Sequence, residues 1–180
     1  MATTAPAMEK GDTAAYQQKL LGLLGNRDPI EVMSKTADVL ARIVEENPAS
    51  VMQTRPFPGK WTPNEIIGHL SDSEWVYGYR VRLILCQDKP VILGMDQDLW
   101  VAGQKHNDRQ PKDLLAMFRN SRLANLELWR RLAPKDFERV GRHNERGEES
   151  LGLMFRMEAG HDLSHIDQIE RYLKAIRQSE

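Results

Sequence analysis

Two histidines, His161 and His165, stand four residues apart near the carboxyl end of the chain. On an α-helix this H-x-x-x-H spacing puts both imidazoles on one face, one turn apart, where they can reach the same metal ion. At about 100° per residue, both fall within roughly 20° of the apolar line from Met154 to Tyr172. Both imidazoles are therefore predicted to point into the core, where a polar side chain needs a partner.

A third histidine, His69, repeats this pattern on a second predicted helix. It falls among the inward-facing residues Ile66, Val76, Leu83 and Ile84. If the two helices are neighbours, three imidazoles close three sides of a tetrahedron around a divalent metal and leave the fourth position for water or substrate. A helical histidine pair alone is a weak signal, because most such pairs lie on the surface or are hydrogen-bonded. The signal is stronger here, because three of the five histidines lie on inward faces and each would otherwise need its own buried partner.

Several polar side chains share these faces and are candidates for hydrogen bonds to the ligating imidazoles. Such a bond fixes the tautomer of a ligand and raises its basicity. For Asp72 and Glu158, an interhelical ion pair with Arg80 or Arg122 is an equally good explanation. The candidates are Asp72, Ser73 and Arg80 beside His69, and Glu158 and Gln168 beside the histidine pair.

The other residues whose side chains could take part in catalysis or binding have simpler explanations. His106 and His143 lie in segments without periodicity, so we expect both to be solvated, although either can border the mouth of the bundle. Cys86 has no base beside it and is expected to be a small buried residue. The tryptophans are expected mostly in the core or at helix caps, except Trp100, which stands in an irregular segment where it can wall a pocket.

Composition narrows the class of protein. The chain has 180 residues, 41% hydrophobic and 28% charged, which is typical of one globular domain. With 25 basic and 26 acidic residues it has no positive field to attract nucleic acid or an anionic membrane. No apolar run approaches the roughly 20 residues of a membrane span, and the start of the chain lacks the apolar core of a signal peptide. We therefore predict a cytoplasmic protein that binds neither nucleic acid nor membrane.

Helix start and stop signals give the elements that position the histidines. Thr62, Pro63 and Glu65 form a capping box with proline at the first helical position, and Asp28 with Pro29 gives a similar start. Residues 1–12 are expected to be a disordered tail before a single domain at 13–180. The long connections at 89–110 and 134–149 predict crossovers, and the second segment can hold a turn or ribbon. The predicted helices are a short one at 13–24 and long ones at 29–46, 62–87, 111–132 and 150–176.

With no convincing strand, this pattern predicts an all-α four-helix bundle preceded by a short helix. The chain also resembles the DinB-like superfamily, which includes metal-dependent hydrolases and thiol transferases of the YfiT type. One departure is Ser164, where some members carry an additional histidine. The segments that carry the resemblance are PGKWTPNEIIGHLSDSE at 58–74 with Arg80 after it, DLWVAGQKHNDRQPKDLLAMFRNSR at 98–122, and EAGHDLSHIDQI at 158–169.

The resemblance implies a bundle, often dimeric, in which His69, His161 and His165 bind a divalent metal. These are the residues that helical periodicity selects independently. The favoured hypothesis is an enzyme that uses Zn²⁺, Ni²⁺ or a similar ion, either to hydrolyse a small molecule or to transfer a low-molecular-weight thiol to an electrophile. The alternatives are a non-catalytic metal-binding or dimerisation module and a bundle whose histidines bind no metal.

Overall fold

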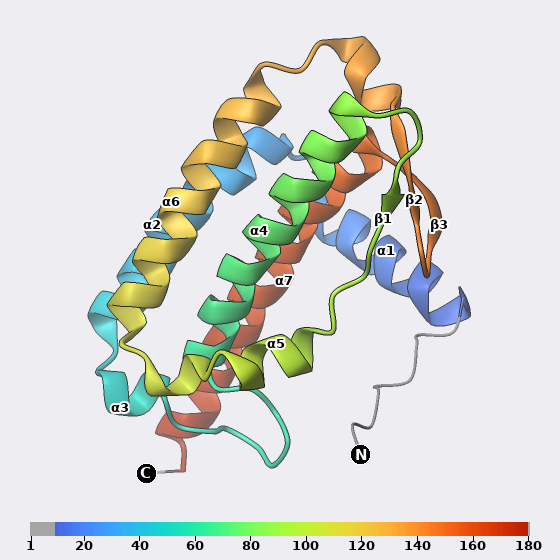
Figure 1. The fold of residues 1–180 in the computed structure, drawn as a ribbon. Helices are drawn as coiled ribbons and strands as arrows, with labels where there is room; N and C mark the ends of the chain where they lie inside the picture. Colours follow the sequence, from blue (N-terminus) through green and yellow to red (C-terminus); the bar gives the residue numbers. More distant parts are fainter. Residues whose placement is uncertain (1–9, 180) are drawn as a thin grey trace.

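Four long helices run side by side in the computed structural model, which describes residues 10–179 (Figure 1). They are α2 (Pro29–Glu46), α4 (Pro63–Cys86), α6 (Pro111–Arg130) and α7 (Leu151–Arg177). The shorter elements are α1 (Lys10–Leu24), α3 (Ala49–Met52), α5 (Gln97–Gly103), two 3₁₀ turns (His106–Asp108 and Pro134–Glu138), and strands β1 (Val91–Ile92), β2 (Val140–His143) and β3 (Gly147–Ser150). Within the described part of the chain, no helix is long and apolar enough to cross a bilayer.

The first two long helices, α2 and α4, do not pack side by side. The helices α2 and α4 each pack against both α6 and α7, so α2 and α4 occupy opposite corners of the bundle. In a simple up-down-up-down bundle consecutive helices are neighbours, which requires only short loops. Here the connection between α4 and α6 runs back along α4, so that Leu93, Gln104 and His106 bond in turn to Arg80, Asp72 and Asn64. The prediction of a four-helix bundle with crossover connections and a preceding short helix is confirmed.

The predicted helix starts are formed by the predicted caps. The Asp28 side chain accepts a hydrogen bond from the backbone N–H of Ile30 at 2.8 Å. The Thr62 hydroxyl accepts from the N–H of Glu65 at 3.1 Å, while the Glu65 carboxylate accepts from the N–H of Thr62 at 2.7 Å. The long helices end within one or two residues of the predicted positions. The first helix, α1, begins at Lys10, earlier than expected, and the rest of the predicted tail lies outside the described residues.

A small sheet covers one side of the bundle. Strands β2 and β3 form an antiparallel hairpin. This hairpin agrees with the turn or ribbon predicted in the segment 134–149. Strand β1 pairs with β2 in parallel, with Ile92 opposite His143, and this pairing was not predicted. The irregular segment 89–110 also contains α5 and the turn at His106. Short elements of this kind carry too few residues for periodicity to reveal them.

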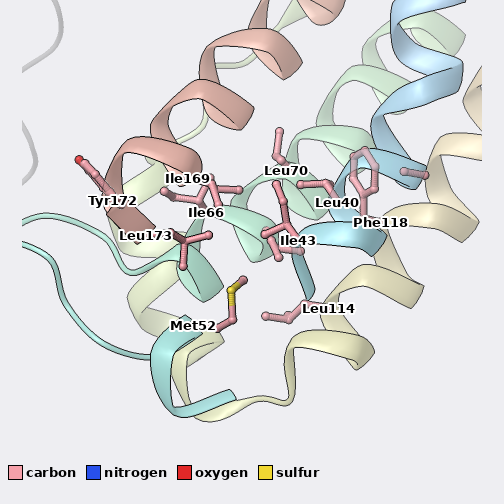
Figure 2. Close-up of a cluster of buried hydrophobic side chains, with 12 residues drawn as sticks. Leu40, Ile43, Met52, Ile66, Leu70, Leu114, Phe118, Ile169, Tyr172 and Leu173 are labelled. Atoms are coloured by element: carbon pink, nitrogen blue, oxygen red, sulfur yellow. The ribbon is translucent and has the colours of Figure 1, made fainter. Parts of the chain in front are cut away.

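Apolar side chains from the four long helices and α3 meet at the end of the bundle that holds the start of α4 and the end of α7 (Figure 2). A second apolar cluster lies further along the bundle, around Met33, Ile84 and Met154. The expectation that Cys86 is buried is wrong, since Cys86 is exposed. Among the tryptophans expected mostly in the core or at caps, Trp75 is the exception, at 66% exposed. The core therefore has two apolar regions, with polar side chains of α4 and α7 between them.

Gly160 on α7 lies directly against the backbone of α1. A Cβ atom there would come within 2.2 Å of the Leu20 carbonyl oxygen, so Gly160→Ala must push the helices apart. We expect it to lower the free energy of unfolding by about 1–3 kcal/mol, measured by urea denaturation. The matched control is Gly22→Ala on α1, whose Cβ would meet no atom within 4 Å. There alanine is expected to add about 0.5–1 kcal/mol, and a loss of equal size in both variants would contradict the close approach.

Candidate metal centre

Three imidazoles from two neighbouring helices converge in the bundle. His69 lies on α4, and His161 and His165 lie one turn apart on α7. Nε2 of His161 is 3.1 Å from Nε2 of His69 and 3.1 Å from Nε2 of His165. The ligand atoms of the three side chains all lie within 4.8 Å of one another. The structure thus brings together the three histidines that the sequence singled out.

This arrangement fits a divalent ion by distance and by chemistry. With metal–nitrogen bonds of about 2.0–2.1 Å, neighbouring ligands of a tetrahedral ion lie about 3.3 Å apart, close to the 3.1 Å found for two of the three nitrogen pairs. A cation placed among the three Nε2 atoms accepts the lone pairs of all of them at once. Within the residues that the structure describes, no fourth histidine, cysteine or carboxylate joins this group. The donor set is therefore that of a site with an open position.

The side-chain amide of Gln168 determines which nitrogen of His165 carries the proton. Its nitrogen donates to the Tyr172 hydroxyl at 3.0 Å, so its carbonyl oxygen faces Nδ1 of His165, at 2.9 Å. A carbonyl oxygen can only accept, so Nδ1 carries the proton and Nε2 keeps its lone pair. This is the tautomer that binding a metal through Nε2 requires, and it is the contact predicted for Gln168.

Removing this hydrogen bond is expected to weaken metal binding without removing a ligand. Gln168→Leu should reduce the affinity for Zn²⁺ about 10- to 100-fold, because the His165 ring loses both its orientation and its tautomer. Gln168→Glu keeps an acceptor at the same place and serves as the control, with affinity close to that of the parent. Competition with a chromogenic chelator measures both, and unchanged affinity in Gln168→Leu would show that the amide has no such role.

Burial keeps the three imidazoles neutral, which is the state in which they bind metal. Burial lowers the pKa of His69 and of His161 well below the ordinary value, and the neighbouring histidines lower both further. Burial also lowers the pKa of His165 to about 4, although the hydrogen bond that His165 donates to Gln168 opposes the shift. All three side chains therefore present lone pairs at neutral pH without prior loss of a proton.

Apart from Gln168, the side chains proposed as hydrogen-bond partners of the three imidazoles bond to other groups. The Asp72 carboxylate accepts from the Gln104 amide at 2.8 Å and lies 2.8 Å from Nε2 of His106. His106 is fully buried, so its predicted solvation is wrong. Its ring packs on Gly68, where a Cβ would come within 2.3 Å of it. The partner of Asp72 is thus neither a ligating histidine nor an arginine, but a buried histidine from a segment that carries no periodic signal.

Arg122 on α6 does not pair with Asp72 or Glu158, the carboxylates expected for it. Arg122 is 2% exposed and pairs with Glu74 on α4 and Asp162 on α7, in both cases with contacts of 2.5 Å. The Asp162 carboxylate also accepts from the Thr36 hydroxyl on α2 at 2.7 Å. This buried cluster connects all four long helices at the level of the histidines. The sequence offers Arg122 an interhelical ion pair, but its partners are Glu74 and Asp162 rather than Asp72 or Glu158.

Glu158 lies in the same region without a cation of its own. Its carboxyl accepts from the Trp129 indole N–H at 3.0 Å, while its second oxygen is buried without a partner. Burial raises the pKa of Glu158 well above its ordinary value, and the nearby charge of Glu74 raises it further. Both effects favour the protonated form of Glu158, and its hydrogen-bond partner is an indole rather than one of the three imidazoles or an arginine.

The raised pKa of Glu158 predicts how the stability of the folded chain depends on pH. The pKa of Glu158 is raised in the folded state, so above the ordinary pKa of glutamate the folded chain keeps a proton that the unfolded chain has lost. Glu158 therefore destabilises the folded state increasingly as pH rises. Glu158→Gln removes this titration and keeps a neutral group of the same shape. The variant should gain stability relative to the parent on going from pH 5 to pH 8, measured by urea denaturation at both values. A difference that does not change with pH would show that Glu158 is ionised in the folded state.

Arg80 and His143 lie on the sheet side of α4. Nε of Arg80 donates to the Leu93 carbonyl oxygen at 3.1 Å, and its guanidinium lies over the Tyr77 ring. His143 is 3% exposed, so the prediction that it is solvated is also wrong. Trp100 on α5 remains 42% exposed.

Comparisons with known proteins give the family context. The sequence pattern of the DinB superfamily matches residues 33–169. The chain is 30% identical over 117 residues to a proposed metal-dependent hydrolase of Oceanobacillus iheyensis, covering 64% of this chain and 67% of the relative. It is 26% identical over 147 residues to YfiT of Bacillus subtilis, also named as a proposed metal-dependent hydrolase, covering 79% and 82%. The solved structure of YfiT, described as an unusual four-helix bundle, matches with a TM-score of 0.69 at 21% identity, over 94% of this chain and 92% of that one.

Proposed function

The chain belongs to the DinB superfamily, and from that premise we propose that it is a metal-dependent enzyme whose ion is held by His69, His161 and His165. The observation that carries the proposal is the convergence of three neutral Nε2 atoms with no fourth protein ligand in the described residues. A structural zinc site is closed by four protein ligands, whereas a catalytic site keeps one position for water or substrate. The hydrolase names of the relatives support the same class of function and a small-molecule substrate.

Zn²⁺ and Ni²⁺ are the proposed ions, since imidazole suits both. An ion held by three neutral imidazoles keeps its full positive charge and supplies a Lewis acid, which either lowers the pKa of bound water towards about 7 or holds a low-molecular-weight thiol as its thiolate. Hydrolysis and thiol transfer are thus two reactions of one centre, and the substrate distinguishes them.

The side chains around the histidines orient the ligands and limit access by water. Gln168 holds His165 in the required tautomer. The Trp61 ring centre lies 4.8 Å from that of His69 and 6.4 Å from that of His165. The Tyr77 ring lies 6.5 Å from that of His161. These two aromatic side chains border the centre, and low polarity there strengthens the interaction between a cation and an anionic reactant.

Cobalt substitution tests whether the fourth position is open. Metal-free protein is loaded with Co²⁺, its visible spectrum is recorded, and a small thiol such as 2-mercaptoethanol is then added. We expect the absorption of a four-coordinate ion with three nitrogen ligands, and a new thiolate-to-cobalt band when the thiol displaces the exchangeable ligand. His161→Ala protein of equal helicity should show neither spectrum.

Activity assays then decide between the two reactions. Protein loaded with Zn²⁺ or Ni²⁺ is tested against chromogenic esters, and separately with a thiol and an aromatic halide, with His161→Ala as the reference. A closed four-ligand spectrum that neither thiols nor small anions alter would overturn the enzyme proposal and favour a non-catalytic metal-binding module.

A further inference from the structure

The three histidines have little contact with solvent. His69 is 2% exposed and His161 is 6% exposed, while His165 is only partly buried, so solvent comes closest at His165. The open position of the proposed function has to admit a reactant larger than water, such as a thiol. Packed protein interiors hold few voids larger than a water molecule, so a side chain that covers the histidines has to move when this reactant enters.

Trp61 covers two of the three imidazoles. Its ring centre lies 4.8 Å from that of His69 and 6.4 Å from that of His165, and its plane is inclined by only 23° to the His165 ring. The indole is itself only partly buried, so it lies between these two rings and the solvent. The other aromatic side chain beside the histidines, Tyr77, belongs to the long helix α4, whereas Trp61 belongs to the loop between α3 and α4 (Figure 1). Trp61 is thus the covering side chain that can move without the displacement of a long helix.

The middle of this α3–α4 loop (residues 53–62) bonds mainly to itself. The N–H of Lys60 donates to the Phe57 carbonyl oxygen at 3.1 Å, and the Arg55 guanidinium donates to the Lys60 carbonyl oxygen. Arg55 also pairs with Glu65, on the first turn of α4, at 3.0 Å. The tip of the loop, from Phe57 to Lys60, is exposed. A segment with exposed hydrogen bonds and few buried contacts opens at a small cost in free energy.

An aromatic contact ties the tip of the loop to the bundle. The Phe57 ring stands edge-on to the Tyr172 ring of α7, with ring centres 5.8 Å apart and planes at 76°. Phe57 is nevertheless 47% exposed, so the contact covers only part of its ring. The Tyr172 hydroxyl accepts a hydrogen bond from Gln168, whose carbonyl oxygen faces His165. The loop is therefore anchored on the same side chains that orient one of the three imidazoles.

We propose that the α3–α4 loop is a gate over the three histidines, with Trp61 as its cover and the contact of Phe57 with Tyr172 as its latch. When Phe57 leaves Tyr172, the loop moves outward and Trp61 uncovers His69 and His165. An aromatic pair shifts an equilibrium by only about 3- to 10-fold, so this latch holds the loop without locking it. Only the reactant rests on the proposed function, because the gate is a property of the metal-free chain.

Chemical modification of the metal-free protein tests the gate without any ion. Diethyl pyrocarbonate reacts with accessible neutral imidazoles, and peptide mass spectrometry at low modification gives the rate for each histidine. Phe57→Ala should raise the rates of His69 and His165 about 3- to 10-fold, because the loop is open for a larger fraction of the time. His143, which is buried on strand β2, is the internal reference and should react at the same rate in parent and variant.

A second substitution separates the cover from the packing role of Trp61. The indole also packs against the apolar cluster at the start of α4, and Trp61→Leu keeps an apolar side chain there while removing the ring. This variant should raise the rates of His69 and His165 at least as much as Phe57→Ala does. The matched control is Trp75→Leu, which replaces an exposed tryptophan on α4 and should change neither rate. Rates equal to those of the parent in both loop variants would overturn the gate.

The Co²⁺-loaded protein tests whether the gate controls access of the reactant. Stopped-flow absorption of the thiolate-to-cobalt band measures how fast 2-mercaptoethanol reaches the ion. Phe57→Ala should raise this rate about 3- to 10-fold at every thiol concentration, and an equal rate in parent and variant would refute control of access by the loop. Phe57 is largely exposed, so this variant answers even if Trp61→Leu does not fold. A chain that shows the expected histidine reactivities but binds no cobalt refutes the proposed function and leaves the gate.

Discussion

Replacing His161 with alanine is expected to reduce the metal content from about one ion per chain to less than about a tenth of that. His161 is the central one of the three proposed ligands, because its Nε2 lies 3.1 Å from those of both other histidines. Its loss leaves two nitrogen ligands on different helices, too few to retain an ion through buffer exchange. Elemental analysis of untagged protein, after incubation with Zn²⁺ or Ni²⁺ and removal of free metal, measures the content.

The matched control is Asp167→Asn, which removes an exposed carboxylate from the same helix. This variant should keep about one ion per chain, since Asp167 pairs with Arg171 at the surface. Circular dichroism establishes that both variants keep the helicity of the parent. Equal metal content in the parent and His161→Ala would place the ion elsewhere and refute the three-histidine centre.

Replacing Arg122 with methionine is expected to lower the free energy of unfolding by about 3–5 kcal/mol. Burial alone would lower the pKa of the Arg122 guanidinium, but Asp162 and Glu74 outweigh it and raise the pKa well above its ordinary value. Methionine fills a similar volume but leaves these two buried carboxylates without their cation. Urea denaturation at pH 7 measures the loss, and much of it should be recovered when Glu74→Gln and Asp162→Asn are added.

The control for this prediction lies one turn away on the same helix. Arg119 pairs with Asp38 at 3.3 Å, and both side chains are largely exposed. Because exposed pairs contribute about 0–1 kcal/mol, Arg119→Met should have a small effect. A loss below about 1 kcal/mol in Arg122→Met would mean that the buried carboxylates are protonated or hydrated in the folded chain.

The candidate metal centre could be predicted because its geometry follows from helical periodicity. His161 and His165 need only one turn of helix to meet, and His69 needs only an inward position on a neighbouring helix. The capping residues Asp28 and Thr62 likewise act within three residues of themselves. The long helices and the convergence of the three histidines therefore depend on signals that are local in the sequence.

The features that sequence reasoning missed depend on contacts between distant segments. His106 is 34 residues from Asp72, its partner. The burial of His143 depends on the parallel pairing of β1 with β2, and two residues of β1 carry no readable alternation. Arg122 pairs with Glu74 and Asp162, which lie 48 and 40 positions away in the sequence. Polar residues on inward faces indicate that such networks exist, but the pairing within them is determined only by the packed structure.

The histidine centre joins helices that are distant along the chain, since His69 and His161 are 92 residues apart. An unfolded chain offers an ion no more than the local pair on α7, and the third ligand arrives only when α4 has docked. An ion bound by all three resists the separation of these helices, which is a step of unfolding. It stabilises the folded state by mass action. Metal supply would thus govern how long each folded molecule lasts rather than how quickly a new one forms.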